Sequence, residues 1–419
     1  LKAKFNVDGN KMMKKLSEEL DFPFKQNGAM VLGFEDDSID KIEELYHRGI
    51  ANGVEQLRII RHDEILKLEP EINDQVQVAL LAPTSGIVSP YEMTIAYAEN
   101  AASNGVTFVF DAEVNKIDRK GHTFVITTSN NQTYECDTLI NCAGVYADKI
   151  YELVANKEAP FQIIPRKGEY CLLDKTYGYL TSHTLFQTPT KMGKGILVTP
   201  TTHENIIVGP NAHDEESKED VDTSIEGLNE VWNKALLTMP HLPKRGIITQ
   251  FAGLRAHAKN YDDFIVGYDK DVINLYNVAA IESPGLTSAP AIAVHVAKEV
   301  AEKMKLSENK AFNPIRKGIP HFAYLSNEER EALIKENPLY GHIICRCEVV
   351  SEGEIVEAIR RVPGAKDLDG VKRRTRAGMG RCQMGFCTPK VMEIIARELH
   401  EDITSVTKKG HGSTMVDKR

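Results

Sequence analysis

Four cysteines near the C-terminal end constrain the fold of this chain more than any other feature. They follow the pattern Cys345-Arg346-Cys347, then 34 residues, then Cys382, then four residues and Cys387. Soft thiolates that converge in this number are typical ligands of zinc or of an iron–sulfur cluster. Zinc ribbons generally pair their cysteines as C-x2-C, and neither pair here has that spacing. Seven cysteines in 419 residues without a secretory leader do not indicate a disulfide framework.

The residues around the second cysteine pair suit a cluster. Gly378, Gly380 and Gly385 let backbone amides approach and hydrogen-bond its sulfurs. Thr388-Pro389 is a typical helix start, and a helix predicted from there to about Leu399 would place its positive end beside the anionic cluster.

These features resemble the bacterioferritin-associated-ferredoxin type of [2Fe-2S] domain, and the resemblance covers Cys345–Leu399. It implies that Cys345, Cys347, Cys382 and Cys387 hold a [2Fe-2S] cluster. The charge also changes here: residues 340–419 carry 15 Lys and Arg against 11 Asp and Glu, while the whole chain has a net charge of -9. We therefore expect a linker at 306–339, a cluster domain at 340–400 and a polar tail at 401–419.

The rest of the chain indicates an α/β protein. Its length suggests two or three domains, and its net negative charge argues against a general nucleic-acid binder. No apolar run reaches the roughly 18 residues that a membrane span needs. Periodicity predicts helices at 38–52, 90–104 and 224–239 and a long helix after Ser283–Thr287 that runs to about Lys305. It predicts strands at 29–34, 106–110, 138–144 and 273–280. Strands that alternate with helices, together with a strand-rich stretch at 162–211, indicate an α/β domain with a second sheet domain threaded through it.

Three segments of this body carry chemistry. Leu139–Asp148 and Ser283–Thr287 each read as a strand followed by a small-residue turn and a helix start. Such a turn is a weak nucleotide-site signal, and it also occurs in ordinary strand–helix connections. Arg255 follows the apolar run Phe251–Leu254, where it either binds an anion or forms a surface ion pair.

Residues 1–305 resemble the D-amino-acid-oxidase-like flavoprotein superfamily, and specifically its FAD-dependent glycerol-3-phosphate dehydrogenase branch. Matching segments include Gly86–Glu92, Pro165–Tyr170 and Asp262–Gly267. The resemblance implies FAD-side parts at about 80–155 and 250–305, and substrate-side parts at about 1–79 and 156–249. For single residues, it implies that FAD is contacted by Val114, Ala143, Gly144, Gly285, Leu286 and Thr287. It also implies that Arg255 binds the anionic group of the substrate, and Lys167 and His257 are weaker candidates for the substrate site.

One departure from the superfamily concerns its N-terminal strand, G-x-G-x-x-G turn and following acidic residue, which this sequence does not contain. Gly378-Met379-Gly380 does not replace them because no strand precedes it. We expect either that the sequence begins after that segment or that the flavin has been lost.

The resulting expectation is a cytoplasmic FAD-dependent dehydrogenase that oxidises the C2 hydroxyl of sn-glycerol 3-phosphate. Its electrons would pass through the [2Fe-2S] cluster to an acceptor protein. One alternative is an L-2-hydroxyglutarate dehydrogenase, because Ala256 rather than proline follows Arg255. A second alternative is a non-catalytic electron-transfer or scaffold subunit.

Overall fold

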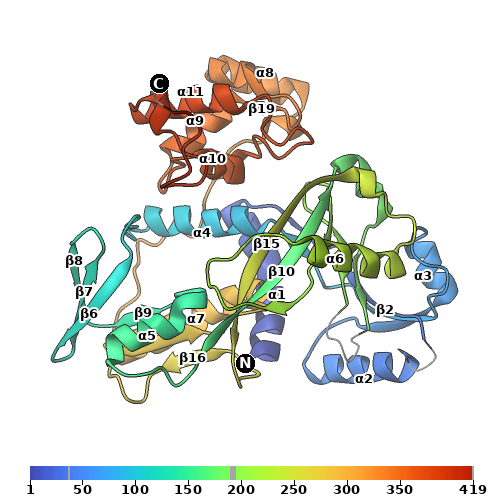
Figure 1. The fold of residues 1–419 in the computed structure, drawn as a ribbon, viewed down its shortest axis with the longest axis horizontal. Helices are drawn as coiled ribbons and strands as arrows, with labels where there is room; N and C mark the ends of the chain where they lie inside the picture. The colour runs from blue at the N-terminus through green and yellow to red at the C-terminus, as the bar shows by residue number, and fades with distance from the viewer. Residues whose placement is uncertain (36–37, 189–194, 418–419) are drawn as a thin grey trace. The chain divides into compact units, whose positions relative to one another are not determined.

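The structure, a computed structural model, describes residues 1–35, 38–188 and 195–417, and it divides into two compact units (Figure 1). Unit 1 comprises Leu1–Lys14, Lys25–Ile87 and Val109–Asn309. Unit 2 comprises Lys15–Phe24, Val88–Phe108 and Lys310–Arg419. Helix α1 (Lys2–Leu20) therefore contributes its first part to unit 1 and its last turns to unit 2.

A mixed sheet forms the larger part of unit 1. Its strands run in the order β14-β10-β13-β12-β11-β2-β4-β3, and β15 pairs with β10 along its whole length, from Ile163 to Leu173. Their bounds are β2 (Ala29–Gly33), β3 (Arg58–Arg61), β4 (Val78–Ala82), β10 (Ile163–Leu173), β11 (Thr184–Gln187), β12 (Leu197–Pro200), β13 (Ile206–Gly209), β14 (His213–Asp214) and β15 (Ile247–Ala258).

Helices cover this sheet on both faces. Helix α6 (Ile225–Thr238) packs on β10 and β13 (Figure 1). It begins where the Ser224 hydroxyl accepts a hydrogen bond from the Gly227 amide at 2.9 Å, and it buries Trp232 against the sheet. Helix α2 (Ser38–Ala51) packs over β4 on the other face, since it contacts Val78 and Leu80 rather than their neighbours. Apolar side chains on both faces of β4 explain why its sequence is a continuous hydrophobic run.

The smaller part of unit 1 is built from two three-stranded sheets. One has the order β16 (Ile265–Tyr268), β17 (Leu275–Ala279), β9 (Leu139–Asn141), and the other has the order β6 (Val114–Lys120), β7 (Thr123–Thr128), β8 (Thr133–Cys136). Helices α5 (Ala147–Ala155) and α7 (Gly285–Met304) follow β9 and β17. The remaining short elements are β1 (Phe24–Lys25), α3 (His62–Leu68), β5 (Ile87–Val88), η1 (Gly144–Tyr146), η2 (Lys175–Leu180) and η3 (Lys244–Gly246).

The strand predicted at 106–110 is wrong. These residues form no strand, and Val106, Val109 and Phe110 are each about half exposed. The β-forming composition of this segment does not suffice, because a strand is stabilised by pairing with a neighbour.

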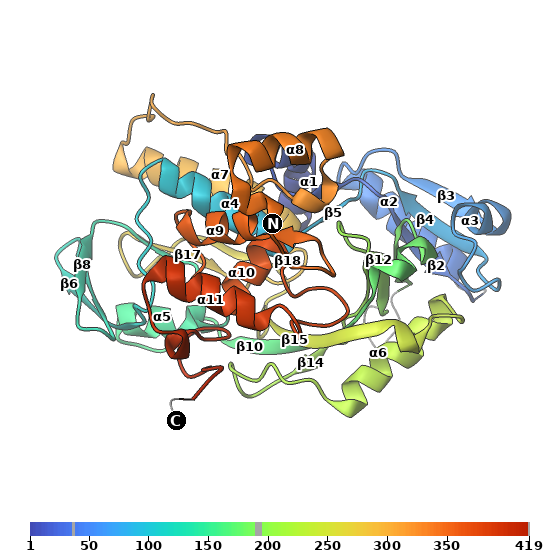
Figure 2. The ribbon, with the colours of Figure 1, turned by 90° about the horizontal axis from the view of Figure 1, so that it is seen from above.

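Unit 2 is mainly helical. It holds α4 (Pro90–Ser103), α8 (Asn327–Glu336), α9 (Glu352–Arg360), α10 (Leu368–Thr375) and α11 (Thr388–Leu399), with the short pair β18 (Ile343–Cys345) and β19 (Val350–Ser351) and the 3-10 turns η4 (Phe322–Tyr324), η5 (Pro338–Gly341) and η6 (Ile403–Ser405) (Figure 2). One core joins α9, α10 and α11, and Val406 completes it. The prediction of an α/β body is thus confirmed, and the region of the predicted cluster domain is mainly helical. Across the described ranges, no helix combines the length and the apolar character that crossing a bilayer requires.

Candidate functional site

The paired strands β10 and β15 present a row of functional side chains on one face. In their antiparallel register Arg166 lies opposite Arg255, Gly168 opposite Gly253, and Tyr170 opposite Phe251. Opposite residues share a face of the sheet. The rings of Tyr170 and Phe251 stack with centroids 5.0 Å apart. A Cβ atom added at Gly253 would meet nothing within 4 Å, so there is room for a ligand above this face.

Arg255 lies across this face with a guanidinium that has no carboxylate partner among the described residues. Its Nη2 donates to the carbonyl oxygens of Asn211 at 2.8 Å and Lys167 at 3.1 Å, and its Nε donates to the carbonyl of Arg166 at 3.3 Å. Burial lowers the pKa of Arg255. A guanidinium held only by carbonyl dipoles keeps its charge available, and its planar fork suits phosphate or carboxylate.

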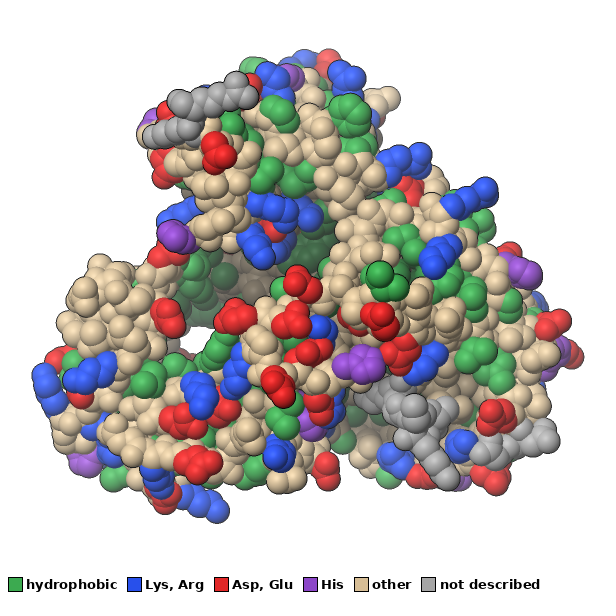
Figure 3. Space-filling view, viewed as in Figure 1, with side chains coloured by type: hydrophobic (Ala, Val, Ile, Leu, Met, Phe, Trp, Pro, Cys, Tyr) green, Lys and Arg blue, Asp and Glu red, His purple; other side chains and the backbone are tan. Residues whose placement is uncertain are grey.

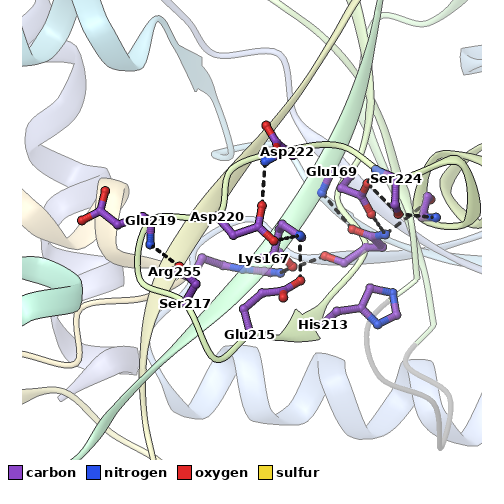
Figure 4. A network of polar contacts seen from close by, with 12 residues as sticks. Lys167, Glu169, His213, Glu215, Ser217, Glu219, Asp220, Asp222, Ser224 and Arg255 are labelled. Atoms are coloured by element: carbon purple, nitrogen blue, oxygen red, sulfur yellow. Dashed lines mark hydrogen bonds and ion pairs between the residues drawn. The ribbon is translucent and has the colours of Figure 1, made fainter. Parts of the chain in front are cut away.

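Lys167 lies next to Arg166 along β10 and therefore points to the opposite face. Its ammonium is 2.8 Å from Glu215 Oε1 and 3.0 Å from Asp220 Oδ2 (Figure 4). The hydrogen bond with Glu215 raises the pKa of Lys167. The structure thus places the Lys167 ammonium apart from the face that carries Arg255.

The acidic 213–222 loop includes the short strand β14 and leads toward α6, and acidic side chains gather over it in Figure 3. Several of its charges are paired within unit 1. Asp214 accepts from Arg166 Nε at 2.6 Å, and Lys218 lies 2.6 Å from the buried Asp148. Together with Lys167, these pairs fasten the loop to β10 and α5.

His257 lies on the same face of β15 as Arg255, two residues further along. Its Nδ1 is 3.3 Å from Glu282 Oε1, which also accepts from Lys2 Nζ at 2.9 Å. Burial alone would raise the pKa of Glu282, but the hydrogen bonds from Lys2 and His257 lower it. Because Glu282 lies shortly before α7, this contact links His257 to the turn at Gly285.

The predicted FAD residues gather along the carboxyl ends of β9 and β17. These strands are parallel, with Asn141 opposite Asn277, so the turns that follow them lie at the same edge. Ala143 and Gly144 follow β9, and Gly285 begins α7 after β17. Gly144 has φ of +57° and its Cβ position is open, so a ligand can approach its backbone.

The first turn of α7 supplies a helix N-terminus at this edge. Leu286 is exposed there, and Thr287 is partly buried. Free amides and the positive dipole end of a helix suit a polar, electron-rich group. Helix α1 crosses this turn closely, because a Cβ atom at Gly9 would lie 1.9 Å from the Thr287 carbonyl oxygen.

Val114 begins β6, in a different sheet, and packs in the same core as α5. The structure therefore brings Ala143, Gly144 and Gly285–Thr287 to one edge of a parallel strand pair and places Val114 in the adjoining sheet. A helix N-terminus, an accessible glycine and two parallel strand ends fit the flavin side of FAD.

The sequence analysis missed a buried pair of asparagines, Asn141 and Asn277, behind this edge. Asn141 Nδ2 donates to the Ala147 carbonyl at 2.8 Å and to Asn277 Oδ1 at 3.2 Å, while its own Oδ1 accepts from the Ala143 amide at 3.3 Å. Asn141 thus fixes the turn through Ala143. An asparagine inside each of two hydrophobic strand sequences was the available signal.

The four predicted ligand cysteines come together in unit 2 as two pairs. Cys347 Sγ and Cys382 Sγ lie 3.6 Å apart, and Cys345 and Cys387 are hydrogen-bonded to each other. The hydrogen bond from Cys387 lowers the pKa of Cys345 to about 6, and amides of Gly378 and Glu348 also donate to its sulfur. Cys387 lies at the start of α11.

This arrangement fits two metal ions with two thiolates each. Two sulfurs bound to one tetrahedral metal would lie about 3.8 Å apart, since metal–sulfur bonds are about 2.3 Å long. Among the described residues, no group of three or more His, Cys, Asp or Glu side chains is placed to hold a metal ion. A [2Fe-2S] cluster takes two cysteines on each iron, which agrees with thiols that lie together in pairs.

Comparisons with known proteins match both parts of the chain. The family model of FAD dependent oxidoreductases matches residues 1–299, and that of the BFD-like [2Fe-2S] binding domain matches residues 343–397. Glycerol 3-phosphate dehydrogenase of Caloramator mitchellensis is 48% identical over 419 residues, covering 99% of this chain and 86% of the relative. L-2-hydroxyglutarate dehydrogenase of Mus musculus is 27% identical, covering 73% and 77%.

A solved structure agrees. Dithionite-reduced L-alpha-glycerophosphate oxidase from Mycoplasma pneumoniae, with FAD bound, superposes with a TM-score of 0.71 at 27% identity, covering 75% of this chain and 83% of that chain.

Proposed function

The chain belongs to the FAD dependent oxidoreductase family, and from that premise we propose that it oxidises the C2 hydroxyl of sn-glycerol 3-phosphate to dihydroxyacetone phosphate. The observation that carries this proposal is the near full-length similarity to a glycerol 3-phosphate dehydrogenase, at an identity well above that to L-2-hydroxyglutarate dehydrogenases. The family match to an oxidoreductase speaks against the alternative of a scaffold subunit.

Arg255 is the residue that we assign to the substrate phosphate. Its guanidinium is partly buried, has no carboxylate partner in the described ranges and lies beside the open position at Gly253. A phosphate above this face would receive charge-assisted hydrogen bonds in a partly desolvated setting. The stacked rings of Tyr170 and Phe251 continue the same face and give it an apolar end.

His257 is the candidate to accept the hydroxyl proton. Oxidation of an alcohol releases this proton, and a histidine with a carboxylate behind it is suited to take it up. Glu282 is that carboxylate, and its contact with Nδ1 leaves Nε2 as the atom that would receive the proton. The contact also holds the imidazole close to the Gly285 turn.

When bound, FAD accepts the two electrons of the substrate and can release them singly to the [2Fe-2S] cluster. We assign the backbone around Ala143, Gly144 and Gly285–Thr287 to the flavin, with Val114 toward the adenine. The four cysteines are assigned to the cluster, whose one-electron chemistry supports an acceptor protein as the partner. The domain boundaries expected from the sequence, including the linker at 306–339, are part of this proposal.

Flavin reduction by different hydroxy compounds tests the substrate. The FAD-loaded protein is mixed anaerobically with sn-glycerol 3-phosphate, glycerol, L-2-hydroxyglutarate or L-lactate, and the flavin absorbance near 450 nm is followed. A tenfold difference in rate between two substrates corresponds to about 1.4 kcal/mol of discrimination between them. Of these four compounds, we expect only sn-glycerol 3-phosphate to bleach the flavin fast. Faster bleaching with L-2-hydroxyglutarate would transfer the assignment to that acid.

A further inference from the structure

Helix α4 is part of the compact unit that contains the cysteine module. It lies in the region matched by the oxidoreductase family, but Val88–Phe108 group with Lys310–Arg419 rather than with unit 1. Helix α10 lies beside α4 in both Figure 1 and Figure 2, and the two helices are in contact. This segment of the oxidoreductase region therefore meets the module directly.

Glu99 of α4 is the ionic centre of this contact. Its side chain is only 6% exposed, and its Oε2 accepts from Arg316 Nε at 2.7 Å and from Arg361 Nη1 at 2.7 Å. Arg316 belongs to the segment before the module, whereas Arg361 ends α9 within it. One buried carboxylate thus joins two guanidiniums, an arrangement whose charge-assisted hydrogen bonds are strong and whose disruption is costly.

Both arginines are held in place by further bonds. Arg316 Nη1 donates to the carbonyl oxygens of Leu20 at 2.7 Å and Asp21 at 2.9 Å, and Arg361 Nη1 donates to the carbonyl of Lys317 at 2.8 Å. These backbone bonds hold the two guanidiniums in the orientation in which they pair with Glu99. Preorganisation of this kind reduces the entropy lost when a contact forms.

A cavity of about 180 Å³ adjoins this cluster and is lined by Glu99, Arg316 and Arg374 of α10. Inside the described structure, the buried Glu99 Oε1 and Arg374 Nε have no hydrogen-bond partner. Burial lowers the pKa of Arg374. Because a cavity with this volume and polarity accommodates ordered water, water can bridge α4 to α10 as well.

A second contact joins the start of α4 to the cysteine loops. The Tyr91 hydroxyl donates to Met379 Sδ at 3.4 Å and accepts from Arg376 Nη1 at 3.5 Å. Arg376, which is 6% exposed, donates through Nε to Glu348 Oε2 at 3.0 Å. Glu348 directly follows Cys347, and its amide donates to the sulfur of Cys345.

We propose that α4 holds the [2Fe-2S] module in place. Glu99 forms the ion pairs of this attachment, and Tyr91 positions the cysteine loops. Glu99 fixes α9 and the preceding segment to α4, and Tyr91 fixes the loop around Met379. This inference rests on the proposed function, because a cluster that relays electrons has to be held in a fixed position. Both are positioning residues, because neither is among the residues assigned to the substrate or the flavin.

The test combines limited trypsin digestion with spectroscopy of the full chain. Glu99→Gln removes the charge with little change in shape, and Glu331→Gln is the matched control because Glu331 forms an exposed pair with Lys335 at 2.8 Å on α8 of the same unit. We expect cleavage after Lys310 and Lys317 to become at least about tenfold faster in Glu99→Gln and to stay unchanged in the control. Tenfold corresponds to 1.4 kcal/mol, less than the cost of removing one partner of a buried ion pair, because Arg316 would lose the carboxylate that pairs with it and Arg361 would keep only Glu357.

A double variant separates this attachment from general instability. Arg361→Gln in the Glu99→Gln background should accelerate cleavage less than it does in the wild-type background, because the two residues act as a pair. Equal acceleration in both backgrounds would overturn the role of Glu99.

Tyr91→Phe tests the second contact without affecting the first. Its iron content should equal that of the wild type, while the electron paramagnetic resonance g values of the dithionite-reduced cluster should shift. Unchanged g values would overturn the positioning role of Tyr91. Wild-type protein without iron after anaerobic purification would instead reject the proposed relay, and the digestion result would still decide whether α4 holds the module.

Discussion

The guanidinium of Arg255 donates to the carbonyl oxygen of Asn211 at 2.8 Å, across the strand that carries Gly168. A Cβ atom at Gly168 would lie 3.2 Å from Arg255 Nη2 and 2.8 Å from the Pro210 side chain. Glycine at this position therefore leaves the space in which the arginine lies flat on the sheet. The cation is held by backbone dipoles, and no carboxylate of the described residues pairs with it.

Replacing Arg255 should weaken substrate binding and leave the fold intact. Loss of a desolvated charged contact costs about 2–5 kcal/mol, so Arg255→Leu should raise KM at least about thirtyfold. Arg255→Lys should recover only part of this loss, because it keeps the charge and loses the fork. Steady-state kinetics with the flavin spectrum as a control check this, and an unchanged KM would remove Arg255 from the substrate site.

Lys167→Met should behave differently from Arg255→Leu. The Lys167 ammonium pairs with Glu215 and Asp220 on the other face, so its loss should loosen the 213–222 loop and change KM by no more than about threefold. Hydrogen exchange of the loop amides should accelerate. A KM effect as large as that of Arg255→Leu would place Lys167 in the substrate site.

Glu69 should make the stability of unit 1 depend on pH. Its buried carboxylate accepts from the Ser182 amide at 2.9 Å, the Ser182 hydroxyl at 2.6 Å, the His183 amide at 2.8 Å and His183 Nδ1 at 2.6 Å. Burial would raise the pKa of Glu69, but these bonds outweigh it and the pKa is lowered.

The pKa of Glu69 is lower in the folded protein than in the unfolded chain. Its carboxylate therefore stabilises the fold at pH values above the unfolded pKa, about 4.3 for glutamate, and this contribution is lost as the pH falls through the folded pKa. Glu69→Gln should therefore cost about 1–3 kcal/mol at pH 7 and less below pH 4. Denaturant melts of both proteins at several pH values measure the difference. A constant difference over this range would contradict the ionic role of Glu69.

Gly9→Ala should destabilise the packing of α1 on α7. The added methyl would lie 1.9 Å from the Thr287 carbonyl oxygen, and backbone atoms must move to accept it. Overpacking of this kind costs about 1–3 kcal/mol. Gly253→Ala is the control because its Cβ position is open, so thermal melts should show a loss of stability for Gly9→Ala only.

Local signals predicted most of the helices well, and apolar periodicity predicted a helix at 224–239 where the structure has α6. The pairs along the sequence did not predict which thiols lie together, because Cys345 pairs with Cys387 and Cys347 with Cys382. The strand at 106–110 failed because β-forming residues do not reveal whether a partner strand is available. The links from His257 to Glu282 and from Glu99 to Arg361 depend on tertiary contacts between distant segments, and no local pattern encodes them.

The relay from substrate through flavin to cluster is tested most directly by electron paramagnetic resonance after anaerobic addition of sn-glycerol 3-phosphate to the loaded protein. The account predicts flavin bleaching followed by the rhombic signal of a reduced [2Fe-2S] cluster, with about two irons and two sulfides per chain. Cys382→Ser should bleach its flavin and give no such signal. A bleached flavin with an intact cluster that stays oxidised, or stoichiometric zinc in place of iron, would contradict it.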